Sequence, residues 1–221
     1  MNRTFPWISC FLLCLIPPLA HGTQDDPGLE LCRKTLARVS ARYQSLETLS
    51  ARFVHTLNAP ALDQREEETG TLRLRRGGYA RWDYDTPEGK LAWSDGKEAY
   101  LYLPQERQVL IRPMDDSLPV RLLMGGADPA EVADCRGAFE LEGEVHLTLA
   151  LREPESGIGE ITLKVDQSRS VITHLEYGDA LGNRISFALS EIQLNPALKQ
   201  DLFSIPIPDG AKIYRDLPST N

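Results

Sequence analysis

Short segments in which apolar and polar residues alternate, joined by turns and not by helices, place the strongest constraint on the fold of this chain. Alternation with a period of two is typical of a strand that buries one face. Asp95-Gly96, between two of these segments, is a strong hairpin signal. Consecutive strands with short turns predict a mainly β protein built on an antiparallel sheet. The segments cover residues 51–57, 70–76, 79–85, 91–94, 98–103, 108–112, 145–151, 161–165, 171–177 and 185–189.

The segments on either side of Gly77-Gly78 carry a test of strand register. A two-residue loop at this point would place each leucine of the first strand opposite a charged residue of the second. A three-residue loop instead pairs Leu74 with Ala80 and Leu72 with Trp82. Because register follows the buried face of a strand, we expect a loop with an odd number of residues or a glycine bulge here.

An amphipathic helix is expected before the strands. Apolar residues recur at alternating steps of three and four, which is the pattern of one helix face. Asp26 followed by Pro27 is a suitable start signal. This face is not unusually wide, which is compatible with covering a core or with lining a pocket. It consists of Leu29, Cys32, Leu36, Val39, Tyr43 and Leu46.

A break between the two runs of strands predicts two short helices. Asp116-Ser117 precedes the first, Leu118–Met124, which ends at Gly125-Gly126. Asp128-Pro129 opens the second, Ala130–Cys135. Such an insertion in an all-β pattern is more often a lid or a plug than a second domain. The candidate lid residues are Leu118, Leu122, Leu123 and Met124.

The first 22 residues have the pattern of a secretory signal peptide. Arg3 supplies the positive start, an apolar run covers Trp7–Leu19, and Ala20-His21-Gly22 has small residues at a cleavage signature. The run is too short to span a bilayer, and Pro17-Pro18 disfavours the alternative of a short membrane anchor. We therefore expect an exported protein whose residues 23–221 form a single domain.

The charge of the chain argues against nucleic acid as a partner. The formal net charge is −8, and removal of the leader takes away only one charged residue, an arginine. No basic stripe with interleaved aromatic residues occurs in the sequence. An anionic surface also keeps a protein away from anionic lipid head groups.

Cys32 and Cys135 are the two cysteines that follow the leader. Export favours a disulfide between them. Such a bond would close a long loop, worth about 4 kcal/mol in the chain-entropy model. Two unpaired buried thiols are the alternative.

A search for catalytic or metal-binding residues finds no recognisable set. The sequence lacks G-x-S-x-G, H-E-x-x-H and P-loop motifs, and neither cysteine has metal-ligand spacing. His55, His146 and His174 lie on separate strands. We expect no enzyme activity, no catalytic residue, no metal and no cofactor.

Arg76 is the unusual residue of the strand pattern. By alternation it falls on the same face as Leu72 and Leu74, and burial of an unpaired guanidinium costs several kcal/mol. One interpretation is a rim arginine whose head reaches solvent. The other is a latch, in which Arg76 donates to carbonyls at the end of a lid helix, which have no intrahelical partner.

Four stretches, in this order and spacing, resemble one family. They are LETLSARF from Leu46, GTLRLRRGGYARWDYDTP from Gly70, WSDGKEAYLYLP from Trp93 and NPALKQDLFSIPIPDGAKI from Asn195. The chain resembles the periplasmic outer-membrane lipoprotein carrier proteins, the LolA-like family. This resemblance implies an incomplete, strongly curved antiparallel β-barrel covered by helices, with an apolar cavity for acyl chains.

The resemblance also implies a location, partners and a site. We expect a monomer in the periplasm of a Gram-negative bacterium, loaded by an inner-membrane ATP-driven lipoprotein-releasing complex and unloaded by an outer-membrane lipoprotein receptor. The cargo would be lipidated proteins or other acyl lipids. The family's functional arginine matches Arg76, followed here by Gly77-Gly78 where the family usually has a proline. A lipid-binding or lipid-sensing module serving another pathway is the alternative. The candidate acyl-chain residues are Phe53, Leu72, Leu74, Trp82 and Leu101.

Overall fold

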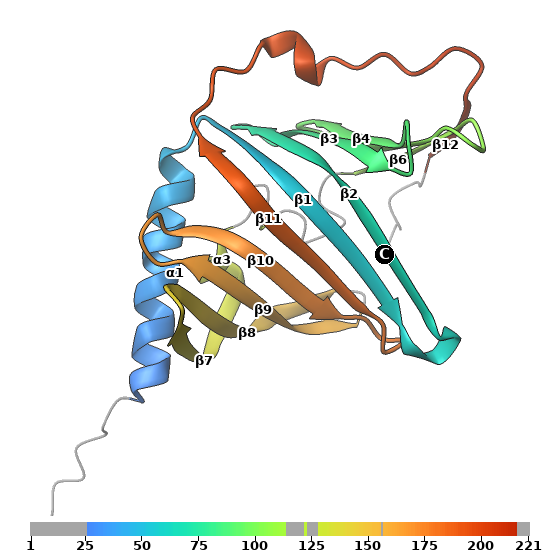
Figure 1. Cartoon of the computed structure of the whole chain (residues 1–221). Coiled ribbons are helices and arrows are strands. Elements are labelled where there is room, and N and C mark those ends of the chain that lie inside the picture. The colour runs from blue at the N-terminus through green and yellow to red at the C-terminus, as the bar shows by residue number, and fades with distance from the viewer. Residues whose placement is uncertain (1–25, 114–121, 123–127, 156, 216–221) are drawn as a thin grey trace, which may run out of the picture.

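A computed structural model describes residues 26–113, 122, 128–155 and 157–215. Twelve strands form one sheet in the order β12-β6-β5-β4-β3-β2-β1-β11-β10-β9-β8-β7. Figure 1 shows an open, curved sheet with helix α1 standing against one side. The expected mainly β fold class is confirmed, and the order of the strands in the sheet leaves β12 and β7 at the two edges.

Neighbouring strands pair antiparallel, except that β12 runs parallel to β6. β1 pairs with β2 on one side and with β11 on the other, which joins the two runs of strands into one sheet. The strands are β1 Thr48–Ala59, β2 Gln64–Arg75, β3 Tyr79–Thr86, β4 Leu91–Asp95, β5 Glu98–Leu103, β6 Gln108–Pro113, β7 Ala133–Leu141, β8 Glu144–Glu155, β9 Ile158–Asp166, β10 Val171–Gly178, β11 Arg184–Leu194 and β12 Lys212–Arg215. The helices are α1 Pro27–Ser45, α3 Pro129–Val132 and the short 3-10 turns η1 Pro60–Leu62 and η3 Gln200–Phe203.

The register of β2 and β3 is the one that the apolar pattern predicts. Leu74 pairs with Ala80, and Leu72 pairs with Trp82. Three residues, 76–78, connect the strands. Gly77 and Gly78 have φ of 92° and 81°, a left-handed conformation that glycine adopts without a steric penalty. The odd loop therefore keeps both apolar faces on the same side.

Helix α1 begins where the sequence indicates. The Asp26 side chain accepts a hydrogen bond from the Gly28 backbone N–H, which caps the first turn. Leu36 and Val39 on its apolar face are 3% and 1% exposed. Cys32, also buried on this face, forms a disulfide with Cys135 of β7. The expected pair of cysteines thus fastens α1 to an edge strand of the sheet.

The second predicted helix of the insertion is wrong in its extent. Helix α3 ends at Val132, and β7 begins at the next residue. The register of β7 with β8 shifts between Cys135 and Gly137. This irregularity interrupts the period-two pattern of apolar residues, so the sequence carries no clear signal for the strand.

The first predicted helix of the insertion lies almost wholly outside the described residues. Leu122 is the described member of the candidate lid, and it is helical and 1% exposed. Leu118, Leu123 and Met124 fall outside the described parts of the chain.

Two apolar clusters cover the two faces of the sheet. The larger one lies on the face that α1 packs against, called the interior face below, and draws on β1–β3 and β7–β11. The smaller one lies on the opposite, outer face, where Trp93, Val109 and Ile111 pack against Ile205 and Ile207 of the C-terminal segment. Within the described ranges, no helix combines the length and the apolar character needed to cross a bilayer.

Candidate functional site

The interior face carries a continuous apolar row across five strands. Leu72 of β2 pairs with Trp82 of β3, which pairs with Ala92 of β4. Ala92 pairs with Leu101 of β5, which pairs with Leu110 of β6. Because directly paired residues point to the same side of a sheet, the row places three of the predicted acyl-chain residues on one face.

The predicted residues differ in burial along this face. Phe53, Leu72, Leu74 and Trp82 are at most 6% exposed and belong to the main core. Leu101 is only half-buried and lies toward the end of the sheet that carries β12. The structure therefore brings four of the five residues into one cluster and places the fifth on the same face at its margin.

An aromatic cluster occupies the middle of the interior face. The Phe53 ring makes edge contacts with Trp82 and Tyr84, with ring centroids 4.9 and 5.0 Å apart. Phe187 of β11 contacts Trp82 in the same way at 5.7 Å. Gly70 lies beneath Phe53, and a Cβ there would come within 2.7 Å of the ring. Phe187 is not among the predicted acyl-chain residues, although the alternation of residues 185–189 placed it on a buried face.

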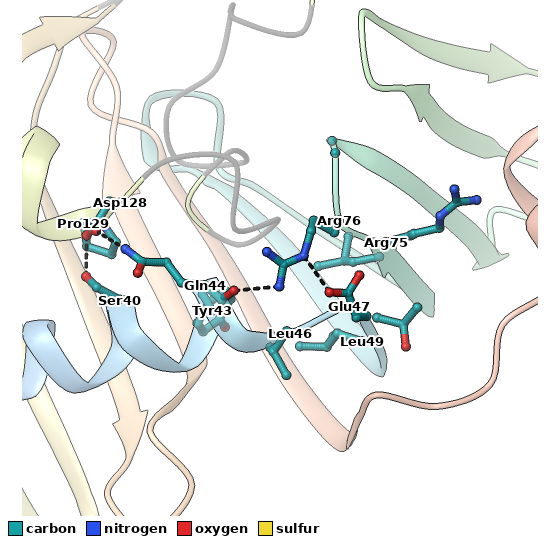
Figure 2. A pocket seen from close by; sticks show the side chains of 14 residues that line it. Ser40, Tyr43, Gln44, Leu46, Glu47, Leu49, Arg75, Arg76, Asp128 and Pro129 are labelled. Carbon is teal, nitrogen blue, oxygen red and sulfur yellow. Dashed lines mark hydrogen bonds and ion pairs between the residues drawn. The ribbon is translucent and has the colours of Figure 1, made fainter.

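A pocket of about 230 Å³ opens at one end of the interior face, where the end of α1 meets the start of β1 and the β2–β3 loop (Figure 2). This volume falls below the 300–1,000 Å³ of typical ligand pockets. The pocket lies beside the close-packed core and is called the entrance pocket below. It is lined by Ser40, Tyr43, Gln44, Leu46, Glu47, Thr48, Leu49, Leu74, Arg75, Arg76, Gly77, Gly78, Asp128 and Pro129.

Arg76 lies at the rim of this pocket and not in the core. Strand β2 ends at Arg75, but the Arg76 backbone N–H still donates to the Glu47 carbonyl at 2.9 Å, as a continued pairing with β1 would require. The Arg76 side chain lines the pocket together with Leu74 and is 50% exposed. Its position fits the rim arginine that was the simpler of the two interpretations.

Arg76 nevertheless bonds to a helix end. Its Nη2 donates to the Gln44 carbonyl at 2.6 Å, and its Nε lies 3.0 Å from Glu47 Oε1. Gln44 is in the last turn of α1, where carbonyls have no intrahelical partner. Figure 2 shows the guanidinium between Gln44 and Glu47. This acceptor belongs to α1, whereas the latch interpretation placed it on the first helix of the insertion, most of which lies outside the described residues.

A second set of bonds connects the same end of α1 to the insertion. Ser40 Oγ donates to Asp128 Oδ1, and Gln44 Nε2 donates to Asp128 Oδ2 at 3.4 Å. Asp128 also accepts from the Ala130 backbone N–H at 2.9 Å and so caps α3. The last turns of α1 thus bond to the β2–β3 loop on one side and to α3 on the other. Sequence reasoning identified Asp128 only as a helix start, and it carried no signal for Ser40 or Gln44.

Three polar side chains lie on the interior face beyond the aromatic cluster. Lys90 Nζ is 2.5 and 2.7 Å from the two carboxylate oxygens of Glu68, and His55 Nδ1 is 3.2 Å from Glu68 Oε2. Burial lowers the pKa of His55, against the opposing effect of the Glu68 hydrogen bond. Burial also raises the pKa of Tyr84, whose ring lies under Lys90 Nζ. In the described ranges, His, Cys, Asp and Glu side chains form no group arranged to hold a metal ion.

The fold and the sequence are both similar to those of known proteins. A conserved protein from Thermus thermophilus, described as uncharacterized, has a similar fold, with a TM-score of 0.54 and 16% identity over 83% of this chain and 98% of that one. The chain is 27% identical over 217 residues to an outer-membrane lipoprotein carrier protein from Chromohalobacter salexigens, covering 97% of this chain and 99% of that one.

A second carrier protein, from Pseudomonas syringae pv. syringae, is also 27% identical, over 186 residues that cover 83% of this chain and 89% of that one. Residues 44–206 match the family described as outer membrane lipoprotein carrier protein LolA. That range includes the sheet from β1 to β11, the pocket rim at Arg76 and the polar side chains beyond the aromatic cluster. The chain therefore belongs to the LolA family of outer membrane lipoprotein carrier proteins.

Proposed function

We propose that this protein carries lipoproteins across the periplasm by holding their acyl chains against the interior face of its sheet. The observation that carries the proposal is the apolar row from β2 to β6, with Arg76 at the rim of its entrance. Membership of the lipoprotein carrier family and two relatives with that name support it. The role is one of transport, with no catalytic step.

The energetics explain why such cargo needs a carrier. Each methylene taken from water contributes about 0.8 kcal/mol. Three chains of about sixteen carbons therefore reach roughly 40 kcal/mol as an upper figure. Cargo of this kind does not cross an aqueous gap unless a protein covers its chains.

Loading requires the interior face to open. The core residues of this face are close-packed, and the entrance pocket has a volume of only about 230 Å³. We infer that α1 moves away from the sheet at the end where Arg76 bonds to the Gln44 carbonyl. Cargo must then break these bonds, which lowers its net affinity and so favours delivery to a receptor.

The partners in this proposal follow from the same chemistry. An inner-membrane ATP-driven lipoprotein-releasing complex would supply the free energy to extract the chains, and an outer-membrane lipoprotein receptor would accept them. Residues 1–22 would direct export to the periplasm of a Gram-negative bacterium, with residues 23–221 as a single monomeric domain.

One observation favours a second function, a lipid-binding or lipid-sensing module of another pathway. Gly77 and Gly78 follow Arg76 with φ of 92° and 81°, values that proline, fixed near −65°, never adopts. The loop after the arginine is thus built differently from the proline-containing loop usual in the family.

Identification of the natural cargo tests both functions. The protein would be purified from its native periplasm without detergent, and its bound material identified by mass spectrometry. Lipidated proteins or peptides are the result that we expect. Free fatty acid or phospholipid alone would favour the second function.

A further inference from the structure

The polar cluster of His55, Glu68 and Lys90 interrupts an otherwise apolar face. His55 of β1 and Glu68 of β2 are directly paired, and Lys90 reaches them from the β3–β4 connection. Their side chains are only 23%, 18% and 14% exposed. The interior face continues beyond them, where Leu57 pairs with Ile185 and Ile185 packs against the core. The cluster therefore interrupts the apolar face on β1 and β2, whereas Phe187 and Ile185 continue this face on β11.

The side chains of His55 and Lys90 are both hydrogen-bonding partners of Glu68. Both carboxylate oxygens of Glu68 accept from Lys90 Nζ, and Oε2 also lies 3.2 Å from His55 Nδ1. Stacking on Phe187, with ring centroids 4.4 Å apart, fixes the His55 ring, and Lys90 Nζ lies 4.4 Å from the centre of the Tyr84 ring. Since the charges are already paired, they offer nothing to an anionic head group. They act instead as a barrier to an apolar chain.

The affinity of a chain should stop rising where it meets this barrier. Each methylene that moves from water onto apolar surface raises affinity about fourfold. A methylene placed against a buried ion pair gains no such increment, because separating the pair leaves charges that are costly to bury.

The distance from the entrance to the cluster corresponds to a defined number of carbons. Leu49 lines the entrance pocket, and His55 lies six residues further along β1. At a rise of about 3.3 Å per residue this distance is roughly 20 Å. A staggered chain of about 1.5 Å carbon–carbon bonds advances about 1.3 Å per carbon, so roughly sixteen carbons span it.

We propose that the Glu68–Lys90 ion pair, with His55, is the end wall of the acyl-chain site and limits the bound chain to about sixteen carbons. This inference rests on the proposed function, with the polar end of the cargo at the Arg76 rim and the methyl end toward the wall. It names a chain-length specificity and the residues that set it.

A series of saturated fatty acids from twelve to twenty-two carbons tests the wall. Each acid competes with a bound fluorescent fatty-acid probe on the intact mature protein. We expect affinity to rise by about fourfold per methylene up to about sixteen carbons and then to level off. Glu68→Leu/Lys90→Met removes the buried ion pair and leaves the His55 ring stacked on Phe187. A chain should then reach Leu57, two residues further, so the break should move by about five carbons. A twenty-carbon acid should then bind at least tenfold more tightly than to the wild type.

The controls separate this inference from the proposed function. Glu176→Leu/Arg184→Met removes an exposed ion pair of β10 and β11, whose members are 38% and 70% exposed, and should leave the break in place. Replacing both partners of a buried pair is often neutral or stabilising, and thermal melting checks each variant. A rise in affinity that continues to twenty-two carbons, or the same break in both double variants, overturns the wall alone. Failure of the wild type to bind any acid overturns the proposed function as well.

A second measurement needs no variant. A sixteen-carbon acid with a photoreactive diazirine at its methyl end is irradiated on the wild-type protein, and the labelled peptides are identified by mass spectrometry. We expect label on Glu68, Lys90 or His55, and no such label with the twelve-carbon homologue. Label from the sixteen-carbon acid at Leu57 or Ile185 would contradict the wall.

Discussion

The two ends of the interior face differ in how far their charged side chains are exposed to solvent. At the entrance, Arg76 is 50% exposed, and its partner Glu47 is 71% exposed. At the far end, Lys90 and Glu68 are 14% and 18% exposed. Exposed ion pairs contribute about 0–1 kcal/mol, whereas loss of one member of a buried pair costs about 3–5 kcal/mol. Breaking the ion pair at the entrance should therefore cost little free energy, whereas losing one member of the far pair should cost much more.

The partners differ in kind as well as in burial. Arg76 contacts a side chain and a carbonyl of the last turn of α1, so its bonds depend on the position of that helix. Glu68 lies on β2, in register with His55 on the neighbouring strand. In the proposed loading step α1 moves and the sheet does not, so the two charged sites should respond differently to mutation.

The largest effect is expected from Glu68→Leu, which leaves Lys90 buried without its carboxylate. We expect a loss of about 3–5 kcal/mol in the free energy of unfolding, measured by urea denaturation. Glu47→Leu, the matched change at the entrance, should cost less than about 1 kcal/mol. Equal losses in the two variants would remove the distinction between the ends.

Leu74→Glu introduces a charge at the entrance end, where Leu74 is 5% exposed and lines the entrance pocket. We expect a fluorescent fatty acid to bind at least tenfold more weakly, because its chain must pass this position; about 1.4 kcal/mol corresponds to that ratio. Ile205→Glu is the control on the outer face, where Ile205 packs against Trp93 and Val109. Unchanged binding by a folded Leu74→Glu variant would show that the chain lies elsewhere.

Arg76→Leu should change function more than stability. We expect a change of less than about 1 kcal/mol in the free energy of unfolding, because the guanidinium is half exposed. Cargo should be held more tightly, since it no longer competes with the bond to Gln44, and transfer to purified receptor or liposomes should slow. Arg75→Leu, a change to the neighbouring pocket residue, is the control. Transfer at the wild-type rate would leave Arg76 as a rim residue with no part in release.

The smallest effect is a pH dependence at the far end. Burial lowers the pKa of His55 in the folded protein, so the unfolded chain binds this proton more readily. Stability should therefore decline as pH falls through the unfolded value near 6.5. His55→Gln removes this contribution, so the difference in unfolding free energy between wild type and variant should change from pH 8 to pH 5.5. A constant difference across that range would contradict the assignment.

The outcome at Arg76 shows where pattern reasoning reaches its limit. The alternation of Leu72 and Leu74 predicts the strand and its register, because a period of two is a local property of the backbone. It does not predict that the strand ends at Arg75, nor which helix end lies beside Arg76. The identity of that helix depends on packing between segments that are distant in sequence.

The sequence alone determined the features that depend on neighbouring residues or that allow only a small number of pairings. The N-cap at Asp26, the three-residue loop before Tyr79 and the pairing of Cys32 with Cys135 belong to this group, the last because an even count leaves one partner. Tertiary structure decided the rest. Gln64–Thr69 is a polar stretch with three successive glutamates, and only its pairing with β1 turns Glu68 inward beside His55. Burial of a charge depends on the strands that surround it, and composition does not specify those neighbours.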